Sequence, residues 1–362
     1  MPTYSSLVNT GSLRAQRHGF FDAHCDTVMK VLDASEDFLR PGGTKHISFP
    51  EMVEADIRAQ IFACFVLSAH HPDAEFERAC RMIEAVVEMA ASTNGELRII
   101  RTGSELHEAF SGGPRAGILS LEGADPLGTK AETIREFYKR GVRSLIFAWR
   151  DNAFSGTAFG SNTRLTGQGK RLLGLCEEMG IMVDVSHLSD LAFHEVVELS
   201  EKPFVASHSD CRALCPSLRN LTDEMIRVLA DRGGVMGINL SPAFLDPEFA
   251  AAVKPLHEAA ARPETSPQEQ RTLREQMLTI PRPALDWVAR HVLHAINVGG
   301  EDCIGIGGDL DGIGQTPDGI DTVADYSKFG PLFREAGLSD RQIEKVCTKN
   351  FLRVFSEVLP AS

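Results

Sequence analysis

The chain has 362 residues, of which 43% are hydrophobic and 24% are charged, and its formal net charge is −13. This composition is that of an ordinary globular protein. The negative charge argues against nucleic acid or an anionic membrane surface as a partner, because both require a basic patch. The longest apolar-rich run, "IFACFVLSA", has only nine residues, far fewer than a membrane span needs. We therefore expect neither a nucleic-acid nor a membrane partner.

The beginning of the chain and its cysteines indicate where the protein resides. Residues 1–18 form a polar N-terminal extension without the apolar core of a secretory signal. The eight cysteines include no CxxC pair and no small-scaffold framework. Reduced cysteines and a cytoplasmic location are therefore expected.

Short apolar runs of strand length alternate with amphipathic, helix-like segments along the chain. The eight runs span residues 19–24, 59–68, 116–123, 143–149, 181–187, 203–209, 234–240 and 303–312. Eight such units predict a parallel sheet closed into a (β/α)₈ TIM-type barrel, an α/β fold. A doubly wound open sheet is the alternative, but no glycine-rich dinucleotide fingerprint follows the first run.

The spacing between runs is uneven. A long, partly polar segment at 241–302 separates the seventh run from the eighth. We interpret this segment as a helical insertion around a surface loop, and residues 1–362 as a single hydrolase barrel domain.

The first run ends with ionisable residues at alternate positions. Asp22, His24 and Asp26 occupy these positions in "GFFDAHCDTV", and alternation predicts that their side chains share one face of a strand. Asp22 lies deeper than the other two, so we expect it to orient a metal ligand rather than to bind metal.

Ionisable residues also follow other predicted strands, whose C-terminal ends meet at one rim of a barrel. Five of the eight runs end in residues that bind metals: His24 and Asp26, Glu122, His187, His208, and Asp309 with Asp311. One such residue could simply cap the following helix, but capping does not explain the joint pattern. Histidines and carboxylates together suit zinc. Glu122 would bridge two cations, and Asp309 would carry a proton.

Several stretches resemble the renal (membrane) dipeptidase family, zinc peptidases of the amidohydrolase superfamily. They include "FDAHCDTV", "SLEGADPL", "IGIGGDLDG" and "NFLRVF". The central block is the most specific, with a DxSH strand end, the His of "ASHS" 21 residues later, and then "RNLTD". The resemblance covers most of the chain.

The resemblance implies two Zn²⁺ ions per subunit and a set of site residues. His24 and Asp26 would hold one zinc, and His187 and His208 the other. Glu122 would bridge both metals together with a hydroxide that attacks the amide bond. Asp309 would act as base and then as acid, and Arg219 would bind the substrate's C-terminal carboxylate.

The chain departs from the family pattern after the fourth run. Members such as the mammalian enzyme carry a substrate-binding His there, but this chain has "AWRDN". Trp149 stands at the position of that His. Either Trp149 or Arg150 then polarises the scissile carbonyl, or the pocket prefers a different substrate.

The resemblance therefore implies a binuclear zinc dipeptidase that acts on small dipeptide-like substrates, including L-Xaa-D-Xaa, and that forms a homodimer. One alternative is an N-acyl amino acid amidohydrolase with the same metal site. The other alternative is a non-catalytic barrel that serves as a binding or scaffold protein.

Overall fold

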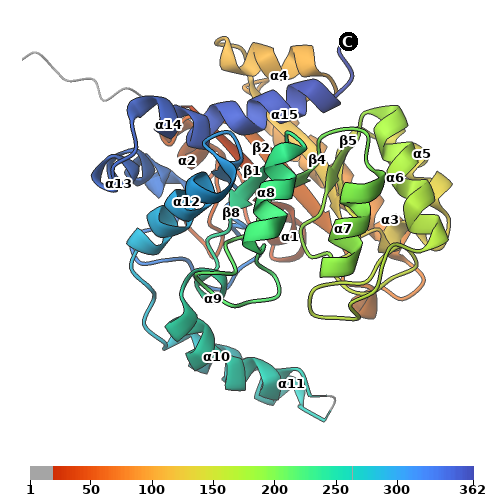
Figure 1. Ribbon diagram of the computed structural model, residues 1–362. Coiled ribbons are helices and arrows are strands. Elements are labelled where there is room, and N and C mark those ends of the chain that lie inside the picture. The colour runs from red at the N-terminus through yellow and green to blue at the C-terminus, as the bar shows by residue number, and fades with distance from the viewer. Residues whose placement is uncertain (1–18, 263) are drawn as a thin grey trace, which may run out of the picture.

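The computed structural model describes residues 19–262 and 264–362. The predicted N-terminal extension, residues 1–18, lies outside the described residues. The part described contains a closed barrel of parallel strands surrounded by helices (Figure 1).

Each of the eight predicted runs contains or overlaps a barrel strand, which confirms the (β/α)₈ fold. The strands are β1 (Phe20–Cys25), β2 (Ile57–Phe65), β4 (Arg115–Glu122), β5 (Val142–Ile146), β6 (Met182–Asp184), β7 (Val205–Ala206), β8 (Val235–Ile238) and β9 (Ile304–Ile306). They pair in chain order, and β9 closes the ring on β1. A further short strand, β3 (Leu97–Ile99), pairs with the first residues of β4 and was not predicted.

Helices cover the outside of the barrel. They are α1 (Thr27–Asp33), α2 (Phe49–Glu54), α3 (Glu75–Ser92), α4 (Gly103–Phe110), α5 (Ile134–Lys139), α6 (Gly167–Met179), α7 (Asp190–Leu199), α8 (Asp223–Asp231), α9 (Pro242–Leu245), α10 (Pro247–Ala260), α11 (Pro267–Leu278), α12 (Asp286–Gly299), α13 (Phe329–Glu335), α14 (Asp340–Glu344) and α15 (Asn350–Val358). Several begin at a Ser or Thr whose side chain accepts a hydrogen bond from the first turn, as Thr166, Ser189 and Thr222 do.

The last helix closes the N-terminal end of the barrel. Phe351, Val354 and Phe355 of α15 pack against Phe21 of β1 and Ala116 of β4 in one buried cluster. Figure 1 shows α15 lying across one end of the barrel beside α4. The opposite, C-terminal end of the strands is therefore the one where a site can open to solvent.

The segment between β8 and β9 is helical, as predicted, but its parts differ. Helix α12 packs along α8 on the barrel. Helices α10 and α11 pack against each other and project from the body (Figure 1), and α11 buries none of its side chains. Only the α10–α11 hairpin therefore stands apart from the barrel.

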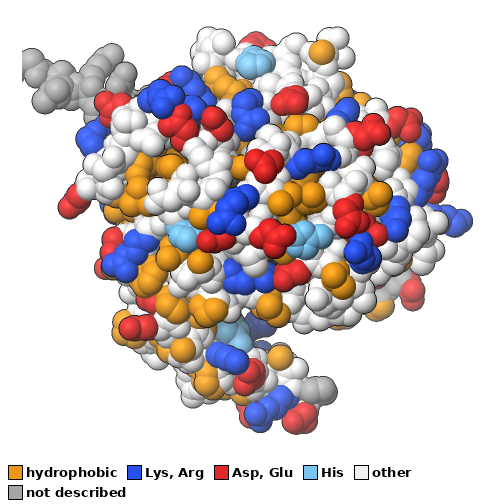
Figure 2. All heavy atoms as spheres, viewed as in Figure 1, with side chains coloured by type: hydrophobic (Ala, Val, Ile, Leu, Met, Phe, Trp, Pro, Cys, Tyr) orange, Lys and Arg blue, Asp and Glu red, His pale blue; other side chains and the backbone are white. Residues whose placement is uncertain are grey.

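The distribution of charged side chains on the surface agrees with the globular composition of the chain. Figure 2 shows basic and acidic side chains interspersed over one face of the molecule. Among the described residues, none of the helices has the length and apolar character that crossing a bilayer requires.

His291 ties α12 to the barrel loops. Its Nδ1 accepts a hydrogen bond from the Cys211 backbone N–H at 3.0 Å, and its Nε2 lies 2.9 Å from the Leu245 carbonyl oxygen. The ring is buried, and burial lowers its pKa from 6.5 to about 4. Protonation of Nδ1 would also break the bond from Cys211.

We predict that His291 makes stability depend on pH. Because the unfolded chain binds the proton first, the contribution is complete above the ordinary histidine pKa and is lost as pH falls towards the folded value. Between about pH 8 and about pH 5, the wild type should lose about 2 kcal/mol more unfolding free energy than His291→Gln. Chemical denaturation of both proteins in chelator checks this. Parallel losses would contradict it.

Candidate metal centre

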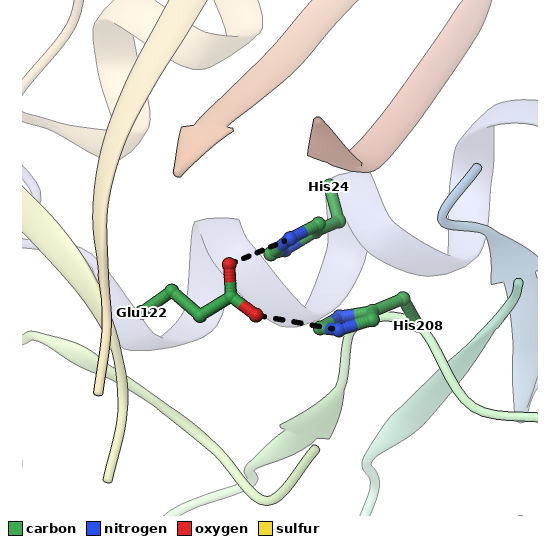
Figure 3. A group of neighbouring side chains, drawn as sticks. All are labelled: His24, Glu122 and His208. Carbon is green, nitrogen blue, oxygen red and sulfur yellow. Dashed lines mark ion pairs between the residues drawn. The ribbon is translucent and has the colours of Figure 1, made fainter. Parts of the chain in front are cut away.

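Glu122 lies at the centre of the predicted site, at the C-terminal end of β4. Its Oε2 is 3.3 Å from Nε2 of His24, and its Oε1 is 3.1 Å from Nε2 of His187. Nε2 of His208 lies 4.0 Å from the same Oε1. Figure 3 shows the carboxylate between the rings of His24 and His208, with one oxygen directed to each. One oxygen of this carboxylate thus faces His24, and the other faces His187 and His208.

The remaining predicted ligands complete these two groups. Asp26 lies 3.5 Å from Nε2 of His24, while Nε2 of His187 and Nε2 of His208 are 2.9 Å apart. Potential ligand atoms of His24, Glu122 and His208 lie within 4.8 Å of one another, as do those of His24, Asp26 and Asp309. The structure therefore brings together all six residues predicted to bind metal or to carry the proton.

The prediction that Asp22, His24 and Asp26 share one face of β1 by simple alternation is wrong. The pairing of β1 with β2 shifts between Asp22 and Cys25, so that β1 uses one residue more than its partner. Asp22 instead accepts hydrogen bonds from the hydroxyl of Tyr326 and the backbone N–H of Gly308. Tyr326 packs in the layer between the strands and the outer helices. The bulge thus lets His24 reach the site while Asp22 secures the β1–β9 junction.

Hydrogen bonds near the ends of β6 and β7 orient His208. The Ser207 hydroxyl lies 2.8 Å from Nδ1 of His208, which leaves Nε2 for the site. Asp184 accepts hydrogen bonds from the backbone N–H groups of Ser186 and Ser207, so it joins the two loops. Ser189 caps α7, which leaves His187 free of the capping role considered from the sequence.

Two site residues adopt backbone conformations that side chains disfavour. His187 has φ of 69° and Asp309 has φ of 56°. A left-handed conformation costs roughly 1–2 kcal/mol for a residue with a side chain. Such outliers concentrate at functional sites, where the surrounding structure holds them in place.

Asp309 is held by a neighbour that the sequence did not single out. The Nδ2 of Asn239 donates a hydrogen bond of 2.9 Å to Oδ2 of Asp309, which leaves Oδ1 3.9 Å from Nε2 of His24. Burial raises the pKa of Asp309 to about 6. One oxygen is therefore anchored, and the other faces His24, a predicted metal ligand.

Burial dominates the electrostatics of the other groups. It raises the pKa of Asp26 to about 8, with the Glu122 charge acting in the same direction. Burial also opposes ionisation of Glu122, but His24 and His187 lower its pKa well below the usual range. Burial lowers the pKa of His187 to about 4, so this ring is neutral and can serve as a ligand.

The unpartnered polar atoms fit a metal ion. Within the described part of the chain, both ring nitrogens of His24 and Oδ1 of Asp26 are buried without a hydrogen-bond partner. Buried polar atoms rarely lack partners, and a bound ion is one explanation for those that do. Imidazole and carboxylate donors in this number suit zinc or a similar divalent cation.

Comparison with known proteins identifies the family. A family model described as membrane dipeptidase (peptidase family M19) matches residues 14–362. The chain belongs to this family. The match confirms the resemblance seen in the sequence and the assignment to the metallo-dipeptidases.

Individual members of the family are similar over most of the chain. A crystal structure of dipeptidase AC is 26% identical, with a TM-score of 0.81, and the match covers 96% of this chain and all of that one. A metallopeptidase from Rhodobacter sphaeroides, solved with a phosphinate mimic of L-Ala-D-Ala, is 26% identical with a TM-score of 0.79, covering 94% and 99%. An uncharacterized protein from Klebsiella pneumoniae is 29% identical over 279 residues, 75% of this chain and 92% of that protein.

The three residues predicted to contact substrate, Trp149, Arg150 and Arg219, each have different neighbours. Trp149 lines the cavity above Glu122 and His187. The side chain of Arg150 instead lies 3.4 Å from Asp125. Arg219 is buried, and it donates hydrogen bonds to the Ser209 hydroxyl and the His208 carbonyl oxygen.

Sequence reasoning missed three residues of the site. Asn239 directly follows β8, where the strand-end rule could have found it. Met29 and Phe65 line the same cavity as Trp149, but their apolar side chains gave no sign of a site because core residues have the same pattern.

We predict that Glu122→Gln impairs metal binding at both positions. The amide removes the negative charge that two neighbouring cations would share, so metal affinity should fall on the order of 100-fold or more. Competition with a fluorescent chelator and elemental analysis of the purified protein measure this. The matched control is Glu108→Gln, an exposed glutamate of α4 that should bind metal as the wild type does. Unchanged metal content in Glu122→Gln would contradict the assignment.

Proposed function

We propose that the protein is a binuclear zinc dipeptidase, with His24 and Asp26 holding one ion and His187 and His208 the other. The observation that carries this proposal is the Glu122 carboxylate, whose two oxygens face the two histidine groups. Zinc held here would supply a Lewis acid that lowers the pKa of water to near neutrality.

The surroundings of Asp309 support a proton-transfer role. Asn239 anchors Oδ2, so Oδ1 is the atom that can accept a proton from the attacking water and return it to the leaving amine. Burial raises the pKa of this carboxyl to about 6, close to the range in which a group can both take and give a proton.

Arg219 supports recognition of a carboxylate. Arg219 is only 3% exposed, and neighbouring carboxylates such as Asp309 and Asp184 favour its charge. Its Nε is buried without a hydrogen-bond partner, so an anionic substrate group would complete the arrangement. The C-terminal carboxylate of a dipeptide is such a group.

Two further proposals concern the setting of the enzyme. All eight cysteines lie in the described part of the chain and are buried and free, which supports a reducing, cytoplasmic location.

A single catalytic domain that pairs as a homodimer is also proposed. Size-exclusion chromatography with light scattering tests the dimer.

Asp309→Asn should keep both zinc ions and lose most of the turnover. The amide oxygen of the new asparagine can still accept the hydrogen bond from Asn239. The amide cannot take a proton, so kcat should fall by roughly 10²–10⁴-fold. Zinc content and kcat are measured together, with the exposed Asp318→Asn of the same loop as control. Loss of zinc from Asp309→Asn would show that Asp309 is a ligand instead.

The substrate class is tested with a panel of L-L and L-D dipeptides and N-acyl amino acids. The proposal expects hydrolysis of free-amine dipeptides that stops in chelator and returns with zinc. Hydrolysis confined to N-acyl amino acids would favour the alternative amidohydrolase on the same metal site. Zinc-loaded protein that hydrolyses no amide would favour a non-catalytic barrel.

A further inference from the structure

The cavity at the C-terminal end of the barrel has two chemically different sides. It has a volume of about 100 Å³. One side consists of Asp26, Glu122, His187 and Asp309, which belong to the proposed metal and proton-transfer site. The other side contains three large apolar side chains, Met29, Phe65 and Trp149. We call these three residues the apolar wall.

Two residues of the apolar wall lie in regular elements, and the third, Trp149, lies in the β5–α6 loop. Phe65 is the last residue of β2, and Met29 lies in α1, which directly follows β1. The rings of Phe65 and Trp149 pack together with centroids 4.8 Å apart, and the Trp149 ring lies 6.2 Å from that of His187. The wall therefore adjoins the proposed metal site directly.

Trp149 leaves much of its indole surface in water. Its exposed fraction is 41%, whereas most large side chains of the barrel are buried. Covering apolar surface is favourable by roughly 25 cal/mol per Å². An apolar group of a bound molecule would gain from contact with this face.

One residue of the apolar wall, Phe65, stands across the barrel from Arg219, whereas Trp149 follows β5, two strands from β7. In the closed ring of strands, β2 is four strands from β7 in either direction. Phe65 belongs to β2, and Arg219 follows β7 and contacts Ser209 and the His208 carbonyl oxygen. A dipeptide whose C-terminal carboxylate is bound by Arg219 would thus direct its amino-terminal residue towards Phe65, against which Trp149 packs.

The negative charge of Asp125, which lies near the apolar wall, is already compensated by neighbouring side chains of the protein. Asp125 accepts hydrogen bonds from Ser68 at 3.1 Å and Asn152 at 3.2 Å, and it lies 3.4 Å from Nε of Arg150. This carboxylate is therefore engaged by the protein itself. Asp125 is thus not free to form an ion pair with a cationic substrate side chain.

We propose that the apolar wall selects substrates whose amino-terminal residue carries a large apolar side chain, with Trp149 as the principal specificity-determining residue. This inference rests on the proposed dipeptidase function and on the binding of the substrate carboxylate by Arg219. Met29, Phe65 and Trp149 would enclose that side chain while its scissile carbonyl lies beside Glu122.

The first test compares kcat/KM for Leu-Ala, Ala-Ala, Asp-Ala and Lys-Ala, with the C-terminal residue in whichever configuration the enzyme accepts. The wild type should prefer Leu-Ala over the other three by roughly tenfold or more. In Trp149→Ala, the ratio of kcat/KM for Leu-Ala to kcat/KM for Ala-Ala should fall close to one. Equal rates for the four substrates, or an unchanged preference in Trp149→Ala, would overturn the proposal.

Phe159→Ala is the matched control for this comparison. Phe159 is an exposed aromatic residue of the β5–α6 loop, which also carries Trp149. Its ring centroid lies 6.4 Å from that of Phe244, and it does not pack against Phe65. The preference for Leu-Ala should be unchanged in this variant. An equal loss of preference in Phe159→Ala would assign the effect to the loop as a whole and would overturn the role of Trp149.

The second test reports on binding without turnover. The chain has two tryptophans, so Trp287→Phe leaves Trp149 as the only indole. Zinc-loaded protein carrying Trp287→Phe and Asp309→Asn is titrated with the same dipeptides. Leu-Ala should shift Trp149 emission to shorter wavelength and bind roughly tenfold more tightly than Ala-Ala. No shift, or equal affinities, would overturn the proposal.

The two tests separate failure of this inference from failure of the proposed function. Hydrolysis without a preference for Leu-Ala would leave the dipeptidase standing and remove the apolar wall as its selector. If the wild type hydrolyses no dipeptide, the proposed function fails, and the fluorescence titration alone decides whether the wall binds an apolar side chain.

Discussion

The site depends on one buried carboxylate, Glu122, whose ionised form must be stabilised by its neighbours. Burial opposes its charge, and His24 and His187 counter this by charge and by hydrogen bonds. Each of its oxygens faces a different group of histidines. The end of β1 and the loops after β6 and β7 must therefore all converge on the end of β4. The barrel satisfies this requirement because its strands are parallel and all end at one rim.

The supporting contacts protect this convergence. Asp184 joins the loops that carry His187 and His208, and Asp22 fastens the β1–β9 junction beneath His24. Two of the site residues also adopt strained backbone conformations. Rigid positioning of this kind is what metal binding and proton transfer both need.

The sequence predicted the strands and the clustering of six ionisable residues at the rim because both follow periodic rules. Apolar runs of strand length marked the barrel, and polar residues just after them marked the rim, so all six central residues were found. The bulge in β1 could not be predicted, because it depends on pairing with a strand more than thirty residues away. Phe65 was also hidden, since a residue at the rim and a residue in the core have the same hydrophobicity. The direction of Arg150 depended on Asp125, a contact that spacing does not reveal.

The closure of the barrel has a consequence for how the protein is made. Asp22 of β1 pairs with Ile306 of β9, and apolar residues of α15 cover the N-terminal part of β1. On a ribosome, β1 can pair early with β2, but most of the polypeptide must emerge before its second neighbour, β9, exists. Contacts so distant in sequence slow folding, and during that wait Phe21 stays uncovered. Nascent chains of this protein should consequently be clients of chaperones that shield apolar segments during translation.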